Sequence, residues 1–108
     1  MKPKQFRLTA EQISPLLEGY GACIATDRIT VDGLPVGYCY REEPDHDVDS
    51  GWRFLAGDET EDYLDEPGNS GVYNVNTIAN YDRAVLTVVD APTGTVFERS
   101  EDDRLLPV

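Results

Sequence analysis

Val36-Gly37-Tyr38-Cys39-Tyr40-Arg41 is the stretch of this chain that bears most directly on its fold. In a β-strand successive side chains point to opposite faces, so this stretch presents two sets of residues. They are Val36, Tyr38 and Tyr40 on one face, and Gly37, Cys39 and Arg41 on the other. Alternation of this kind is typical of a sheet with one buried face. The dipeptide Asp32-Gly33 just before it predicts a hairpin turn from an earlier strand.

Further strands are predicted on both sides of this stretch, wherever short apolar runs occur. They cover residues 21–26, 29–31, 51–56, 72–75, 84–89 and 95–98. In the run 51–56, Trp52 and Phe54 are expected to share one side of the strand. The tail 100–108 shows no pattern that predicts a helix or a strand.

An N-terminal helix is predicted to begin at Thr9 and to end at Gly19 or Gly21. The pattern Thr9-x-x-Gln12 is that of a capping box, in which the two side chains satisfy backbone groups at the helix start. Pro15 is tolerated only near the first turn of a helix, so the helix is expected to be short or to begin later.

Two further short helices are expected after strands. One is capped by Asp58 and runs to about Leu64, and the other is capped by Asn76 and runs to Tyr81. The expected fold is therefore α+β. It is a single domain over residues 1–108, with a mostly antiparallel sheet, an N-terminal helix and short helices after strands.

Length and composition agree with one folded core. The 108 residues are 40% hydrophobic and 9% aromatic, more than a disordered acidic chain carries. No apolar run approaches the roughly 18–20 residues that cross a bilayer, and Met1-Lys2-Pro3-Lys4 is not followed by the apolar stretch of a secretory signal. We expect a cytoplasmic protein with no membrane partner. Cys23 and Cys39 are then reduced, half-buried thiols, and a disulfide between them is the alternative.

Negative charge is concentrated in one part of the chain. The net charge is −12, and residues 42–66 hold eleven acidic residues against Arg53 alone. Nucleic acid is therefore a poor direct partner, since proteins bind it with cationic side chains. Such a patch favours a basic protein as partner, because opposite charge raises the association rate. The alternative is a solvated segment that only aids solubility.

The sequence does not fully match any motif of a catalytic or metal-binding site that we considered. The segment 45–51 resembles the start of a calcium loop, but Ser50 stands where the loop needs Gly and Ala56 where it needs a bidentate Glu. A carboxylate pair such as Glu42 and Glu59 could act as a catalytic acid and base only in a pocket that makes the pKa values of the two groups differ. No nucleophile elbow, phosphate-binding loop or dinucleotide motif occurs. We therefore expect that the protein is not an enzyme, and that it has no catalytic residue, no metal site and no cofactor.

Trp52 and Arg53 beside the acidic segments suggest a protein interface instead. Trp, Tyr and Arg carry much of the binding energy in interfaces, and surrounding acids favour a cationic partner. The alternatives are core packing for Trp52 and Phe54, and local capping bonds for the polar turn 76–82. The candidate partner-binding residues are Glu42, Glu43, Asp45, Asp47, Asp49, Trp52, Asp58, Glu59, Glu61, Asp62, Asn76, Asn80 and Tyr81.

Several blocks of the sequence resemble a known bacterial family. They are Gly37 to Asp45, Asp49-Ser50-Gly51-Trp52-Arg53-Phe54, and Asn74 to Asp82, within a likeness that runs from about residue 23 to 99. The chain is similar to the predicted immunity proteins of polymorphic toxin systems, immunity family thirty-three. Relatives often have Pro and Met where this chain has Arg83 and Cys39, and neither change affects a charged block.

The resemblance implies an α+β domain that protects its producer by binding a toxin, with no catalytic residues. It favours interpreting the acidic patch as an interaction face for a basic toxin. The alternative is a regulatory or house-keeping domain that binds a small molecule or another cellular protein.

Overall fold

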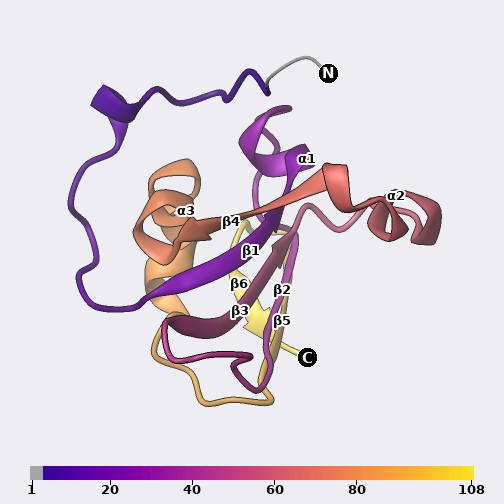
Figure 1. The fold of residues 1–108 in the computed structure, drawn as a ribbon. Helices are drawn as coiled ribbons and strands as arrows, with labels where there is room; N and C mark the ends of the chain where they lie inside the picture. The colour runs from indigo at the N-terminus through magenta and orange to yellow at the C-terminus, as the bar shows by residue number, and fades with distance from the viewer. Residues whose placement is uncertain (1–3) are drawn as a thin grey trace.

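The computed structural model describes residues 4–108 and arranges six strands in one mixed sheet (Figure 1). The order across the sheet is β4-β1-β3-β2-β5-β6. β1 runs parallel to β3, and the other neighbouring pairs are antiparallel. The α+β class is confirmed, but the sheet is mixed rather than simply antiparallel. The strands are β1 (Ala22–Thr26), β2 (Tyr38–Arg41), β3 (Asp49–Leu55), β4 (Ser70–Asn74), β5 (Val96–Arg99) and β6 (Leu105–Pro107).

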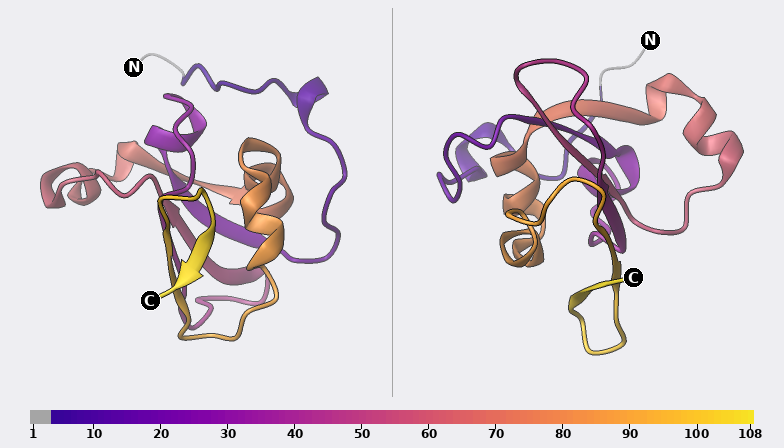
Figure 2. Two further views of the ribbon diagram at one scale, coloured as in Figure 1. Left: turned by 180° about the vertical axis from the view of Figure 1, so that it is seen from behind. Right: turned by 90° about the horizontal axis from the view of Figure 1, so that it is seen from below.

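The helices are short and unevenly placed about the sheet. One face of the sheet is packed by α1, α3 and η3, which also contact one another (Figures 1 and 2). The helix α2 stands on the other side of the strands from α3. One face of the sheet is therefore covered and the other is largely open. The helices are α1 (Asp27–Thr30), α2 (Glu61–Asp65) and α3 (Val75–Tyr81), with 3₁₀ turns η1 (Ala10–Gln12), η2 (Pro67–Asn69) and η3 (Arg83–Thr87).

The core lies between the covered face of the sheet and these helices. Trp52 and Phe54 share one side of β3 as predicted, and both point into the core, with their rings stacked and centroids 5.7 Å apart. Trp52 also donates its indole N–H to the carbonyl of Val89 at 3.1 Å, so its polar atom is satisfied inside the core. The other buried apolar side chains are Cys23, Ala25, Ile29, Val36, Cys39, Val75, Ile78, Ala79, Val85, Val88, Val89, Phe97 and Leu105.

The N-terminal helix is reduced to the single turn η1. The capping pattern is real, since the Thr9 backbone N–H donates to Gln12 Oε1 at 2.8 Å. The helix cannot continue because Pro15 has no N–H to donate, and its ring would clash with the carbonyl of Glu11. The helical prediction is wrong beyond residue 12.

The predicted strand 29–31 and its hairpin are also wrong. Ile29 and Thr30 belong to α1 and Val31 is its C-cap, and Asp32-Gly33 follows the end of that helix instead of turning a hairpin. Gly33 has a φ of 81°, and the Gly33 and Leu34 N–H groups donate to the carbonyls of Ile29 and Arg28. A glycine with positive φ closes a helix as readily as it turns a hairpin, and three apolar residues cannot distinguish the two.

Residues 84–89 form η3 and a following turn instead of a strand. Asp82 begins η3, because its carboxylate accepts from the Ala84 N–H at 3.0 Å. The tail, in contrast, contains β6, which pairs with β5. Two helix starts also shift by about two residues, since Thr60 caps α2 and Asn74 caps α3.

Both thiols are more deeply buried than predicted. Cys23 lies on β1 and Cys39 on β2, with β3 between these strands, and each is free and at most 1% exposed. Burial raises the pKa of each thiol to about 12, because the thiolate would lose its hydration. Within residues 4–108, no helix has the length and apolar character needed to cross a membrane.

Candidate partner-binding face

The open face of the sheet carries two rows of side chains that run across the strands. Strand alternation sends the core residues to the covered face and leaves the intervening residues on the open one. The row through the middle of β3 contains Val72, Ile24, Arg53, Tyr40 and Val96, in order from β4 to β5. The row at the end of β3 contains Leu55, Tyr38, Glu98 and Leu106, in order from β3 to β6.

These rows form a mixed aromatic and apolar surface. Val72 is 70% exposed, and the rings of Tyr38 and Tyr40 lie side by side with centroids 6.0 Å apart. Leu64 of α2, itself exposed, lines a shallow depression of about 260 Å³ with Ile24 and Tyr40 among its other walls. Tyrosine and aliphatic side chains grouped in this way are typical of the centre of a protein interface.

A buried ion pair lies beneath this surface. The Arg53 guanidinium donates to both carboxylate oxygens of Asp49, at 2.9 and 2.8 Å, and its Nε donates to Glu42 at 2.6 Å. The Arg53 and Asp49 side chains are each 5% exposed, whereas that of Glu42 is 50% exposed. The hydrogen bonds from Arg53 hold the pKa of Asp49 well below its usual range, against the opposing effect of burial.

Arg53 is therefore neutralised inside the protein. It is the only Lys or Arg within residues 42–66, and it pairs with Glu42 and Asp49 and lies 3.8 Å from Asp45. Asp58 pairs with Arg28, and the other acidic side chains of the segment make no ion pair among the described residues.

Acidic residues bracket the open face at both ends of β3. The loop 42–48 leads into β3, and residues 58–66 follow it, so the two groups lie at opposite ends of the strand (Figure 1). A strand of seven residues separates them by roughly 20 Å. The exposed candidates in the two groups are Glu42, Glu43, Asp45 and Asp47, and Asp58, Glu61 and Asp62; Glu59 is half-buried.

Trp52 and Asp49 do not belong to this surface. Trp52 has no exposed area and packs on the covered side, and Asp49 is enclosed by its pair with Arg53. Their selection as surface residues is corrected for two different reasons: Trp52 points to the covered face of the sheet, whereas Asp49 is buried by its hydrogen bonds with Arg53. Sequence shows that Trp52 can be an anchor but not toward which side it points.

Asn76, Asn80 and Tyr81 bind the chain's own N-terminal segment. Asn76 Oδ1 accepts from the Leu16 and Leu17 N–H groups at 2.7 and 2.9 Å, and its Nδ2 donates to the Ser14 carbonyl at 3.0 Å. Asn80 bonds the same Ser14 through its N–H and its carbonyl, and the Tyr81 hydroxyl accepts from Leu8 N–H. These long-range bonds were not expected from sequence, and they occur beside the expected local ones, since Asn80 Nδ2 also donates to the Asn76 carbonyl at 2.9 Å.

Residues 4–108 contain no group of three or more His, Cys, Asp or Glu side chains placed to hold a metal ion. In the segment that resembles a calcium loop, the Asp49 carboxylate is occupied by Arg53 and by the Asp45 and Gly51 N–H groups. A carboxylate already bound to a guanidinium is not available as a calcium ligand.

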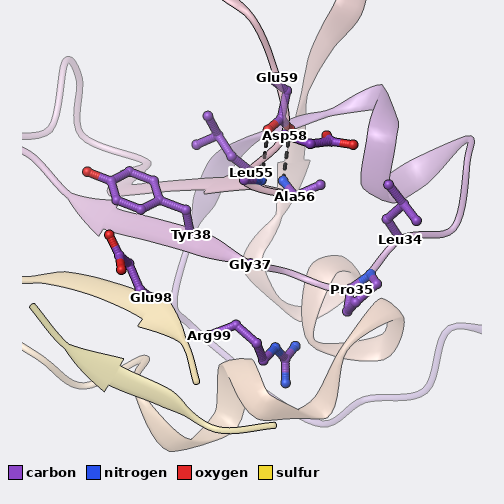
Figure 3. Close-up of a pocket in the computed structure, with 11 residues that line it drawn as sticks. Leu34, Pro35, Gly37, Tyr38, Leu55, Ala56, Asp58, Glu59, Glu98 and Arg99 are labelled. Atoms are coloured by element: carbon purple, nitrogen blue, oxygen red, sulfur yellow. Dashed lines mark hydrogen bonds between the residues drawn. The ribbon is translucent and has the colours of Figure 1, made fainter. Parts of the chain in front are cut away.

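A groove of about 790 Å³ adjoins the open face where β2 begins and β3 ends (Figure 3). Tyr38 and Glu98 point toward one another along one wall, and Leu55, Leu34 and Pro35 supply apolar contacts. Tyr38, Tyr40 and Glu98 were absent from the sequence-based candidates. The alternation of 36–41 contained the signal for the two tyrosines, because the face opposite Cys39 is the open one.

The scan against protein-family models finds the immunity protein Imm33 domain over residues 23–108. Among curated proteins and solved structures, none matches the chain significantly.

Proposed function

The chain belongs to the Imm33 immunity-protein family, and from this premise we propose that it binds and neutralises a basic toxin through the open face of its sheet. Immunity of this kind works by occupying a surface of the toxin, so the protein needs no catalytic residue and no cofactor.

The observation that carries the proposal is the placement of charge around the open face. The acidic loop 42–48 and residues 58–66 stand at the two ends of β3, with Tyr38, Tyr40 and apolar side chains between them. Charge at the edges of a surface steers an oppositely charged protein, and aromatic side chains in the middle supply contact area. This combination supports a cationic partner of protein size.

Charge reversal tests the proposal without disturbing the fold. Glu43, Asp47 and Glu61 are exposed and make no ion pair within the described residues, so their replacement should change stability by no more than about 0.5 kcal/mol each. The variant Glu43→Lys/Asp47→Lys/Glu61→Lys should bind the cognate toxin with a slower association rate. The difference in association rate between the parent and the variant should shrink as the salt concentration rises, because screening weakens electrostatic steering of the toxin by either of them.

A matched control carries the same charge change elsewhere. Glu11, Glu18 and Glu101 are also exposed and lie outside the two acidic groups. The triple lysine variant at these positions should bind and protect like the parent. The assay is survival of cells that co-express a candidate toxin, together with association rates of the purified proteins at two salt concentrations. If both triple variants protect equally well, the acidic groups are not part of the toxin-binding face.

A further inference from the structure

The groove beside Tyr38 has features that distinguish it from the general acidity of the protein. Its walls combine a half-buried aromatic ring, the apolar side chains of Leu34, Pro35 and Leu55, and the carboxylate of Glu98. Tyr38 and Glu98 are directly opposite each other on the antiparallel strands β2 and β5. Their separation is fixed by the sheet, so the pair is held on rigid elements instead of loops.

Glu98 is the carboxylate of this groove that is free to bind. Glu59 accepts from the Ala56 and Gly57 N–H groups at 2.8 Å (Figure 3) and from the Thr26 hydroxyl, and Asp58 is paired with Arg28. Glu98 is exposed and has no side-chain hydrogen bond or ion pair among residues 4–108.

The one guanidinium that lines the groove does not compete for Glu98. Arg99 follows Glu98 in β5, so its side chain leaves the opposite face of the strand and turns away from Tyr38 (Figure 3). It binds the Asp82 carboxylate and donates to the Val36 carbonyl at 2.9 Å. The groove therefore keeps a negative end and an aromatic wall with no internal cation between them.

We propose that this groove accepts an arginine side chain of the toxin, stacked on the Tyr38 ring with its guanidinium paired to Glu98. The inference rests on the proposed function and names the chemistry of one contact within it. Arginine fits better than lysine, because a planar guanidinium stacks on an aromatic face while donating two parallel hydrogen bonds to a carboxylate. The apolar walls suit its methylene stem.

A short peptide tests this contact without the toxin. The ¹⁵N-labelled full chain is titrated with acetyl-Gly-Arg-Gly-amide, and with the Lys and Gln peptides of the same length, while backbone amide shifts are followed by NMR. The arginine peptide should cause saturable shifts at residues 37–38, 56–57 and 98–99. The lysine peptide should bind more weakly, and the glutamine peptide should cause no saturable shift.

Variants connect the shifts to the two side chains. Glu98→Gln should weaken binding of the arginine peptide by about fivefold to tenfold, since a charge-assisted pair becomes a neutral one. Tyr38→Leu should weaken it by about threefold, through loss of the stacking contact. Glu101→Gln, an equally exposed change of charge in the turn after β5, should bind like the parent.

Three results would overturn the inference. They are equal shifts with the glutamine peptide, shifts centred on the loop 42–48 or on α2, and unchanged affinity in Glu98→Gln. Because no toxin is present, such a failure leaves the acidic face as a toxin-binding surface intact. Conversely, a saturable arginine-peptide titration together with full protection by the charge-reversed triple variant would exclude the acidic groups from the toxin-binding face and keep the groove.

Discussion

Replacing Asp49 with Asn probes the buried charge beneath the open face. The change keeps the shape of the side chain but removes the negative charge that faces Arg53, whose side chain is 5% exposed. Breaking a buried ion pair by removing one partner costs about 3–5 kcal/mol. Glu42 remains hydrogen-bonded to Nε at 2.6 Å, so the lower end of that range, about 3 kcal/mol, is expected.

The loss should be visible in thermal and chemical unfolding. A change of about 3 kcal/mol corresponds to a fall in Tm of roughly 10 to 20 °C for a domain of this size. Asp47→Asn is the matched control, because Asp47 is exposed and makes no ion pair among the described residues. Its unfolding free energy should stay within about 0.5 kcal/mol of the parent.

The dependence on pH separates lost charge from lost packing. The folded-state pKa of Asp49 lies below the value of about 3.9 expected in the unfolded chain. The carboxylate therefore contributes its full stabilisation above about pH 4, and the contribution is lost as pH falls toward the folded-state pKa. The difference in unfolding free energy between parent and Asp49→Asn should be constant from pH 5 to 8 and narrow below pH 4. A difference under about 1 kcal/mol at pH 7 would refute the reasoning, as would a larger one that persists unchanged at pH 3.

Three further outcomes are expected. Neither Cys23 nor Cys39 should react with a thiol reagent in the folded protein at pH 8, because both are buried with a pKa near 12. Two reactive thiols should appear on unfolding, and rapid reaction of the native protein would contradict the burial. Millimolar calcium should leave Tm unchanged, since Asp49 is occupied by Arg53, and a rise of several degrees would reveal a site. Asn76→Ala should speed hydrogen exchange most at the Leu17 amide, which loses its acceptor, and less at the Leu16 amide, which keeps the Ser14 carbonyl, and it should cost about 1–3 kcal/mol. Unchanged exchange at Leu17 would show that these bonds do not hold the segment.

Strands were predictable where alternation extended over several residues. β2 covers Tyr38–Arg41 of the stretch 36–41, but Val36, expected on the face of Tyr38, lies before the strand and is buried in the core. The run 51–56 lies almost wholly within β3, with Trp52 and Phe54 on one side as expected. Period-two alternation over five or six residues conflicts with a helix, so local sequence is sufficient there. The run 29–31 is too short to show a period, and it formed a helix.

The run 84–89 failed for a different reason. Its Val-rich composition favours a strand, but Asp82 caps a 3₁₀ turn there, and Val85, Val88 and Val89 pack against the core from that turn. Tertiary packing overrides β-propensity when a buried position is available, because propensity differences amount to only about 1 kcal/mol.

For the candidate site, too, some features were predictable from the sequence and others were not. Sequence alone located the acidic residues and the family, since charge and residue blocks are properties of the chain itself. It could not show that Asn76 and Asn80 are bonded to a segment more than 55 residues away, nor that Asp49 and Arg53 are buried together. Such contacts are decided only when distant segments of the chain come together in the folded protein.

Charge, the strongly alternating strands and family membership were thus determined by the sequence by itself. The tertiary structure decided which face of the sheet stays open, because the parallel pairing of β1 with β3 and the packing of α1 and α3 on one side depend on contacts between distant residues. That choice buried Trp52 and left Tyr38, Tyr40 and Glu98 at the surface. A side chain's direction along a strand is local, but whether that direction leads to core or solvent depends on what the rest of the chain places there.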